Sequence, residues 1–187
     1  YAPMAGWPPL LQAIAAKVEA LYGRRVVGDA EVTVTSGATE ALFCAIHAVV
    51  RPGDEVIVLE PAYDSYEPAV ELAGGRVVRV PLRRPRFGVD WQRVRDAMTS
   101  RTRLLIVNSP HNPTGAVFSD ADLDALGEVL RGSSALVLAD EVYEHIVFGG
   151  RRHAGLLGRP ELAERSFVVS SFGKTFHCTG WKIGYCV

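Results

Sequence analysis

The chain has 187 residues, 48% of them hydrophobic, and a formal net charge of -1. This length and apolar content suit one domain with a sizeable core, and the near-zero charge argues against a nucleic acid or a membrane surface bound through bulk electrostatics. No apolar run approaches the length of a membrane span, and no basic start followed by an apolar run marks a secretory signal.

Apolar residues at helical spacing alternate along the chain with short β-rich apolar runs. Gly23 suits the end of the first helix, and Asp90 and Ser119 suit the starts of two later ones. The alternation predicts an α/β fold with three layers, in which helices cover both faces of a mostly parallel sheet. We expect helices at 10–21, 40–50, 91–98 and 120–130 and one ending at 72, strands at 31–35, 55–59, 76–80, 103–107, 135–139 and 167–169, and an irregular to helical stretch at 151–164.

Both ends of the sequence fall inside segments that we expect to be ordered. Tyr1 stands without a preceding methionine inside a segment that reads as ordered, and Cys186 and Val187 fall within an expected strand. We therefore expect the chain to be the central portion of a longer protein, truncated at both ends.

The three cysteines are Cys44, Cys178 and Cys186, an odd number without metal-type spacing. They predict no metal site and indicate a reducing, cytoplasmic setting. Cys44 falls inside an apolar helical pattern, so we expect its thiol to lie in the core.

Polar residues gather directly after the apolar runs. In an open α/β sheet, ligands bind outside the carboxyl ends of the strands, and parallel strands bring those ends to one edge. Five polar clusters at five strand ends are therefore expected to converge on one crevice. They are residues 36–39, Tyr63, residues 108–115, Asp140 with Tyr143, and residues 170–174.

The last cluster belongs to the stretch SSFGKT at residues 170–175. A lysine such as Lys174, at the mouth of a buried strand, is expected to lose contact with water, which favours its neutral, nucleophilic form. Such an amine forms a Schiff base with an aldehyde, for example pyridoxal phosphate (PLP). The flanking hydroxyls and a second cation, Lys182, suit a phosphate. The alternative is a surface lysine in a Ser/Gly loop.

Residues 36–39 form a small-residue turn that opens a helix. Free backbone N–H groups and the helix dipole favour an anion at such a point. The alternative is an ordinary helix cap provided by Ser36 or Thr39. The turn is not a P-loop, because it lacks Gly-Lys-Ser/Thr at the required spacing, and it is not a dinucleotide fingerprint.

Four other side chains have chemistry that suits a planar cofactor. Asp140 follows five apolar residues, so its shielded carboxylate needs a cationic partner, which a protonated pyridine nitrogen would provide. Asn112 and Tyr143 would donate to a phenolate oxygen, and Tyr63 would stack on a ring. The alternatives are a cap or an arginine ion pair for Asp140, an Asx turn for Asn112, and core packing for the two tyrosines.

In order and spacing, six motifs resemble the fold type I PLP-dependent aminotransferases. The resemblance is strongest to the branch that acts on methionine and aromatic amino acids, which includes kynurenine–oxoglutarate and glutamine transaminases. It covers essentially the whole chain and implies that residues 1–187 are the central part of the PLP-binding large domain. The motifs are YAPMAG at 1–6, VTSGATEA at 34–41, EPAYDSY at 60–66, NSPHNPTG at 108–115, DEVY at 140–143, and SSFGKT at 170–175 with GWKIG at 180–184.

By this resemblance, Lys174 would hold PLP as a Schiff base and would then move a proton between the substrate α-carbon and the cofactor. Asp140 would pair with the pyridine nitrogen, and Tyr63 would stack on the ring. Asn112 and Tyr143 would contact the ring oxygen.

The resemblance also implies a phosphate site and a homodimer. Tyr1 matches a tyrosine that reaches the phosphate of the neighbouring subunit, which implies active sites shared between subunits. Many relatives have arginine where this chain has Lys182, and a lysine keeps the charge but loses the bidentate fork. The residues expected to hold the phosphate within the subunit are Gly37, Ala38, Thr39, Ser171 and Lys182.

The implied activity is transfer of an amino group from an apolar, aromatic or methionine-like L-amino acid to a 2-oxo acid. In this family the arginine that grips the substrate α-carboxylate lies in a C-terminal small domain. We expect that domain and the N-terminal arm to lie outside this chain, so this chain alone is expected to be a poor transaminase. Two alternatives stay open: a PLP-dependent β-eliminating C–S lyase, and a non-catalytic PLP-binding module such as the effector domain of a transcription regulator. The presence of Lys174, Asp140, Asn112 and Tyr143 favours catalysis.

Overall fold

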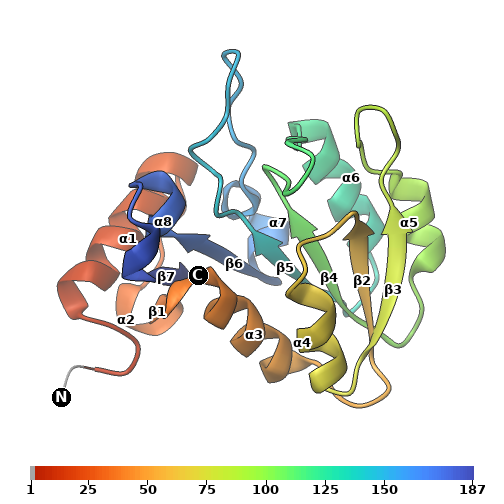
Figure 1. Cartoon of the computed structure of the whole chain (residues 1–187), viewed down its shortest axis with the longest axis horizontal. Coiled ribbons are helices and arrows are strands. Elements are labelled where there is room, and N and C mark those ends of the chain that lie inside the picture. Colours follow the sequence, from red (N-terminus) through yellow and green to blue (C-terminus); the bar gives the residue numbers. More distant parts are fainter. Residues whose placement is uncertain (1–2) are drawn as a thin grey trace.

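The computed structural model describes residues 3–187, so the expected role of Tyr1 lies outside the described part. Within it, seven strands form one sheet in the order β1-β7-β6-β5-β4-β2-β3 (Figure 1). The strands are β1 (Thr33–Thr35), β2 (Glu55–Glu60), β3 (Arg76–Pro81), β4 (Thr102–Asn108), β5 (Leu136–Asp140), β6 (Ser166–Ser171) and β7 (Gly184–Cys186).

The sheet is mostly parallel, as predicted. Strands β3, β2, β4, β5 and β6 pair in parallel, whereas β7 runs antiparallel to both β6 and β1. Because β7 reverses direction between its two neighbours, β1 runs the same way as β6. All strands except β7 therefore end at one edge of the sheet, and β7 begins there.

Helices cover both faces of the sheet, which confirms the three-layer prediction. Alternate residues of β2 show the two faces: Ile57 packs with α1, α5, α6 and α7, and Val58 packs with α3 and α4. Figure 1 shows α3 and α4 together on one side of the sheet. The helices are α1 (Pro8–Tyr22), α2 (Gly28–Glu31), α3 (Gly37–Val49), α4 (Tyr66–Leu72), α5 (Trp91–Ala97), α6 (Asp120–Leu130), α7 (Pro160–Ala163) and α8 (Phe172–Thr175), with 3-10 turns at Leu156–Gly158 and Thr179–Trp181.

The helix boundaries follow the capping residues that the sequence indicated. Gly23 adopts a left-handed conformation with φ of 69° after α1. Asp90 accepts a hydrogen bond from the backbone N–H of Arg93, and Ser119 forms a reciprocal capping box with Asp122. Throughout residues 3–187, no helix has the length and apolar character needed to cross a membrane.

Two expectations about local structure are wrong. The strand expected at 31–35 begins only at Thr33, because Gly28–Glu31 forms the short helix α2, in which the Glu31 carboxylate accepts the Val27 N–H at 2.7 Å. Cys44 is exposed and not a core thiol. It lies off the buried face of α3, which consists of Ala41, Leu42, Ala45 and Ile46.

Candidate functional site

A cavity of about 490 Å³ opens where the strands end. Residues from all five polar clusters line it, so their predicted convergence is confirmed. The reversal of β7 adds a sixth segment, because the residues that precede β7 reach the same edge. The sequence-predicted residues in the lining are Gly37, Ala38, Thr39, Tyr63, Asn112, Asp140, Tyr143, Ser171, Lys174 and Lys182.

The start of α3 forms one wall of the cavity. Ser36, the residue before the helix, makes no side-chain capping hydrogen bond, so the alternative of an ordinary cap at Ser36 is wrong. The first N–H groups of a helix have no partner within the helix. The Ser36 N–H donates to the Glu40 carboxylate, but Ser36 provides no side-chain cap for the N–H groups that follow, and N–H groups of this kind can bind an anion.

Strand β7 passes very close to this helix start, and only glycine permits the approach. A Cβ atom on Gly184 would lie 2.5 Å from the backbone N of Ala38. Gly37 has a φ of 77°, in the left-handed region that favours glycine. The same approach brings Lys182 to the turn, where its Cδ lies 3.9 Å from the position that a Cβ on Gly37 would occupy.

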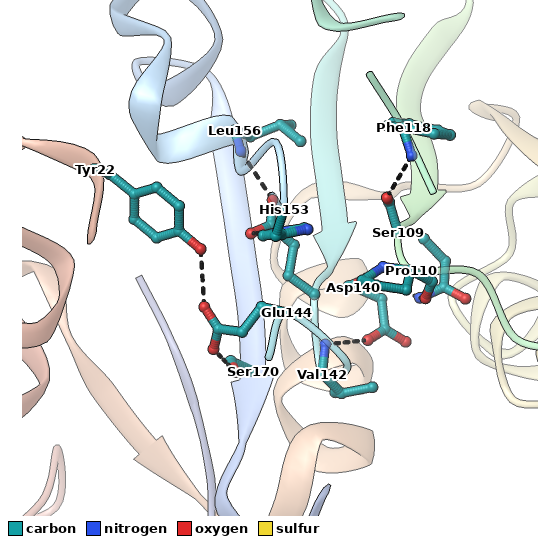
Figure 2. Close-up of polar contacts among 12 residues, drawn as sticks. Tyr22, Ser109, Pro110, Phe118, Asp140, Val142, Glu144, His153, Leu156 and Ser170 are labelled. Atoms are coloured by element: carbon teal, nitrogen blue, oxygen red, sulfur yellow. Dashed lines mark hydrogen bonds and ion pairs between the residues drawn. The ribbon is translucent and has the colours of Figure 1, made fainter. Parts of the chain in front are cut away.

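Asp140, at the end of β5, is buried and has no cationic partner among residues 3–187. It accepts hydrogen bonds from the Tyr66 hydroxyl at 2.7 Å and from the Val142 N–H at 3.3 Å, the second of which Figure 2 shows. Burial raises the pKa of Asp140 to about 6, although both hydrogen bonds act to lower it. Among residues 3–187 no basic side chain forms a salt bridge with Asp140, so the alternative of an arginine ion pair does not hold there.

Sequence analysis missed two buried side chains that shape this part of the cavity. Tyr66 donates to Asp140, and its ring meets that of Tyr63 edge-on with centroids 5.7 Å apart. Asn108 donates to the backbone oxygen of Asp140 at 2.8 Å and accepts the N–H of Asn112 at 2.7 Å. Two features of the sequence could have revealed them: Asn108 is a polar residue at the end of an apolar strand, and Tyr66 lies three positions after Tyr63.

Lys174 lies on the short helix α8 beside Tyr143, with its Nζ 5.6 Å from the centre of that ring. In the described part of the chain, residues 3–187, the side chain of Lys174 is exposed. The expectation that Lys174 is desolvated is therefore wrong there. The physical reason is that α8 has no buried residue and lies at the mouth of the cavity.

Comparisons with known proteins agree with this arrangement. The sequence profile of a family described as aminotransferase class I and II matches residues 1–187. Methionine aminotransferase of Escherichia coli (strain K12) is 54% identical over 100% of this chain and 48% of the relative. Human kynurenine–oxoglutarate transaminase 3 is 37% identical over 97% of this chain and 42% of the relative.

Two solved structures also superpose on the whole chain. An Escherichia coli protein with a methionine aminotransferase function gives a TM-score of 0.98 at 54% identity, covering 50% of that chain. N-succinyldiaminopimelate aminotransferase from Mycobacterium tuberculosis gives 0.96 at 48% identity, covering 49% of that chain. The chain therefore spans about half the length of the relatives it matches.

We predict that Asp140→Asn stabilises the protein when no ligand is bound. The pKa of Asp140 is raised from 3.8 to about 6 on folding. The folded state thus binds this proton more tightly, and stability falls as the pH rises from about 4 to about 6. At about pH 8 the buried charge of Asp140 lowers the free energy of unfolding of the wild type by about 2 to 3 kcal/mol. The Asp140→Asn variant carries no charge there and does not lose this stability.

Urea unfolding of the ligand-free proteins at about pH 8 and about pH 4 checks this prediction. The variant should be more stable at the higher pH, and its advantage should disappear at the lower one. Equal stability at about pH 8 would show that the buried carboxylate is not under this electrostatic cost.

Proposed function

We propose that the protein is a PLP-dependent aminotransferase, since this chain belongs to the aminotransferase class I and II family, which uses pyridoxal phosphate. We also propose that residues 1–187 form the central part of the PLP-binding large domain. The observation that carries the proposal is one cavity with three features among residues 3–187: a helix start that Ser36 does not cap with its side chain, a buried carboxylate without a salt bridge, and an accessible lysine.

The residues present fit this cofactor. A protonated pyridine nitrogen would give Asp140 the cationic partner that it lacks, and the pairing would hold the carboxylate ionised. The hydrogen bond from Tyr66 fixes the orientation of the Asp140 carboxylate before the cofactor binds. Tyr63, which lines the same cavity, would stack on the ring.

The phosphate would bind at the opening turn of α3. Gly37, Ala38 and Thr39 would donate backbone N–H groups, Ser171 would donate its hydroxyl, and Lys182 would contribute a positive charge. The support for a role of Lys182 is that its Cδ lies close to Gly37, at the turn that carries these N–H groups.

When bound, PLP supplies an electron sink that stabilises negative charge at the substrate α-carbon. We propose that Lys174 Nζ would hold the cofactor covalently until the substrate amine displaces it, and that the freed Lys174 amine would then take the proton from the substrate α-carbon as a general base. Its position on the exposed helix α8 leaves room for the side chain to move between these tasks. Asn112 and Tyr143 would donate hydrogen bonds to the ring oxygen, beside Lys174.

The proposed substrates are a 2-oxo acid and an L-amino acid with an apolar, aromatic or methionine-like side chain. The support is the similarity to a methionine aminotransferase and to a kynurenine–oxoglutarate transaminase. The full-length protein should convert more than one equivalent of L-methionine per active site to the keto acid only when a 2-oxo acid acceptor is added. Release of ammonia and pyruvate from an L-cysteine S-conjugate without an acceptor would overturn transamination and indicate β-elimination.

We further propose a homodimer that covers the mouth of the cavity. Large apolar side chains are exposed on the segment before α1 and on the segment that carries Lys174 and Lys182: Trp7 is 65% exposed, Phe176 65% and Trp181 76%. Exposed apolar groups of this size are typical of interaction surfaces. Light scattering of the full-length protein should give the mass of two protomers, and Trp181→Glu should lower it, whereas a monomeric wild type would contradict the proposal.

We also propose a cytoplasmic location. The support is that Cys44, Cys178 and Cys186 are all free thiols, which suits a reducing compartment. Cell fractionation should recover the full-length protein with cytoplasmic enzymes, and recovery in a secreted fraction would contradict this location.

The role of Lys174 predicts the result of a trapping experiment on the full-length protein. With PLP added, borohydride should fix the cofactor to the wild type, and Lys174→Ala should show no fixed cofactor and a turnover lower by on the order of a thousandfold. Lys182→Ala is the matched control, because it also removes a cavity lysine.

In the control, borohydride should still fix the cofactor, but half-saturation should need more PLP because a phosphate contact is lost. Mass spectrometry of tryptic peptides measures the position of the fixed group. Trapping that persists in Lys174→Ala would show that another amine holds the cofactor.

A further inference from the structure

Residues 140–144 cover the end of β5 and the loop after it, and only some of their side chains line the cavity. Asp140 and Tyr143 line the cavity, whereas Glu141 and Glu144 do not line it and are nevertheless 2% and 5% exposed. The Glu144 N–H closes the turn by donating to the Glu141 oxygen at 2.9 Å. Two carboxylates are thus buried behind the two predicted cofactor ligands, and the proposed reaction gives neither a task.

Glu144 receives donors from three other elements. Its Oε1 accepts the Ser170 hydroxyl of β6 at 2.5 Å and the Lys17 ammonium of α1, and its Oε2 accepts the Tyr22 hydroxyl of α1 at 2.9 Å. Tyr185 of β7 lies 3.5 Å from Oε1. Figure 2 shows the Glu144 side chain turned toward Tyr22 and Ser170 while Asp140 points elsewhere.

The carboxylate is charged in this setting. Burial alone would raise the pKa of Glu144, but the Lys17 charge and the hydrogen bonds from Lys17, Ser170 and Tyr22 outweigh burial and hold it below its usual value. A charged acceptor makes stronger and shorter hydrogen bonds than a neutral one. The four elements that meet at Glu144 are therefore held together firmly.

Glu144 and its partner Ser170 are each next to a residue of the cavity. Tyr143 precedes Glu144 in the loop, and Ser171 follows Ser170 in β6. Because neighbouring residues of a strand point to opposite faces, Ser171 lines the cavity while Ser170 meets the carboxylate behind it. From Ser171 the chain continues directly into α8, which carries Lys174.

We propose that Glu144 is a positioning residue that sets the location of Tyr143 relative to Ser171 and Lys174 across the cofactor cavity. The hydrogen bond from Ser170 makes the link, and Lys17 and Tyr22 hold the carboxylate from behind. The inference rests on the proposed function, because the cavity must hold PLP for the link to affect catalysis.

The test uses the full-length protein with PLP bound and compares two serines of one strand. Ser170→Ala removes the β6 donor to Glu144 but leaves both charges in place. Ser166→Ala is the matched control, because its hydroxyl donates only to the Leu162 oxygen at 2.7 Å at the other end of β6. Both variants lose one side-chain hydrogen bond, and Ser170→Ala should lose more thermal stability than Ser166→Ala because its acceptor is charged.

The readouts are the visible circular dichroism of the bound cofactor and the steady-state constants. Ser170→Ala should change the dichroism and lower kcat about tenfold with little change in KM, since misplaced catalytic groups slow the reaction more than they weaken binding. Ser166→Ala should leave both unchanged. Tyr22→Phe should alter the dichroism in the same direction, and the Tyr22→Phe/Ser170→Ala double variant should change it by less than the sum.

Unchanged dichroism and kcat in Ser170→Ala, or an equal change in Ser166→Ala, would overturn the positioning role while leaving the proposed function intact. A wild-type protein that shows no cofactor band would instead overturn the proposed function, and the positioning role with it. The wild-type spectrum therefore separates the two failures.

Discussion

The structure around the cavity is organised about a carboxylate that is buried without a counter-charge in the described part of the chain. Asp140 ends a central strand, and its pKa is raised to about 6 because burial outweighs two hydrogen bonds. Tyr66 from α4 holds its side chain, and Asn108 at the end of β4 holds its backbone. A buried carboxylate of this kind destabilises the fold unless a ligand pairs with it. The loss of stability is therefore located where the cofactor is proposed to bind.

The polar support for the cavity lies mostly outside its lining. Asn108 joins the ends of β4 and β5 to the loop that carries Asn112. Glu144 joins the loop after β5 to β6 and to α1. The lining residues can therefore stay open to a ligand while buried partners hold their backbones, which is the arrangement that a preorganised site requires.

The antiparallel strand β7 has a consequence that a purely parallel sheet would lack. Its reversal brings Lys182 to the edge at which the other strands end, and Gly184 lets the strand lie against the start of α3. A side chain at Gly184 would push β7 away from the turn and move the Lys182 charge with it. The proposed phosphate site thus depends on a glycine that does not itself line the cavity.

The sequence alone determined the layered α/β fold, the caps at Asp90 and Ser119, and the convergence of polar clusters at one edge, because all three follow from local periodicity and from the direction of parallel strands. Only the tertiary structure decided that Lys174 is exposed. It also decided which distant side chains hold the site, since Tyr66 and Asp140 are 74 positions apart, and Lys17 and Glu144 are 127 apart. Such pairings depend on how helices lie across the sheet, and no spacing within one segment encodes them.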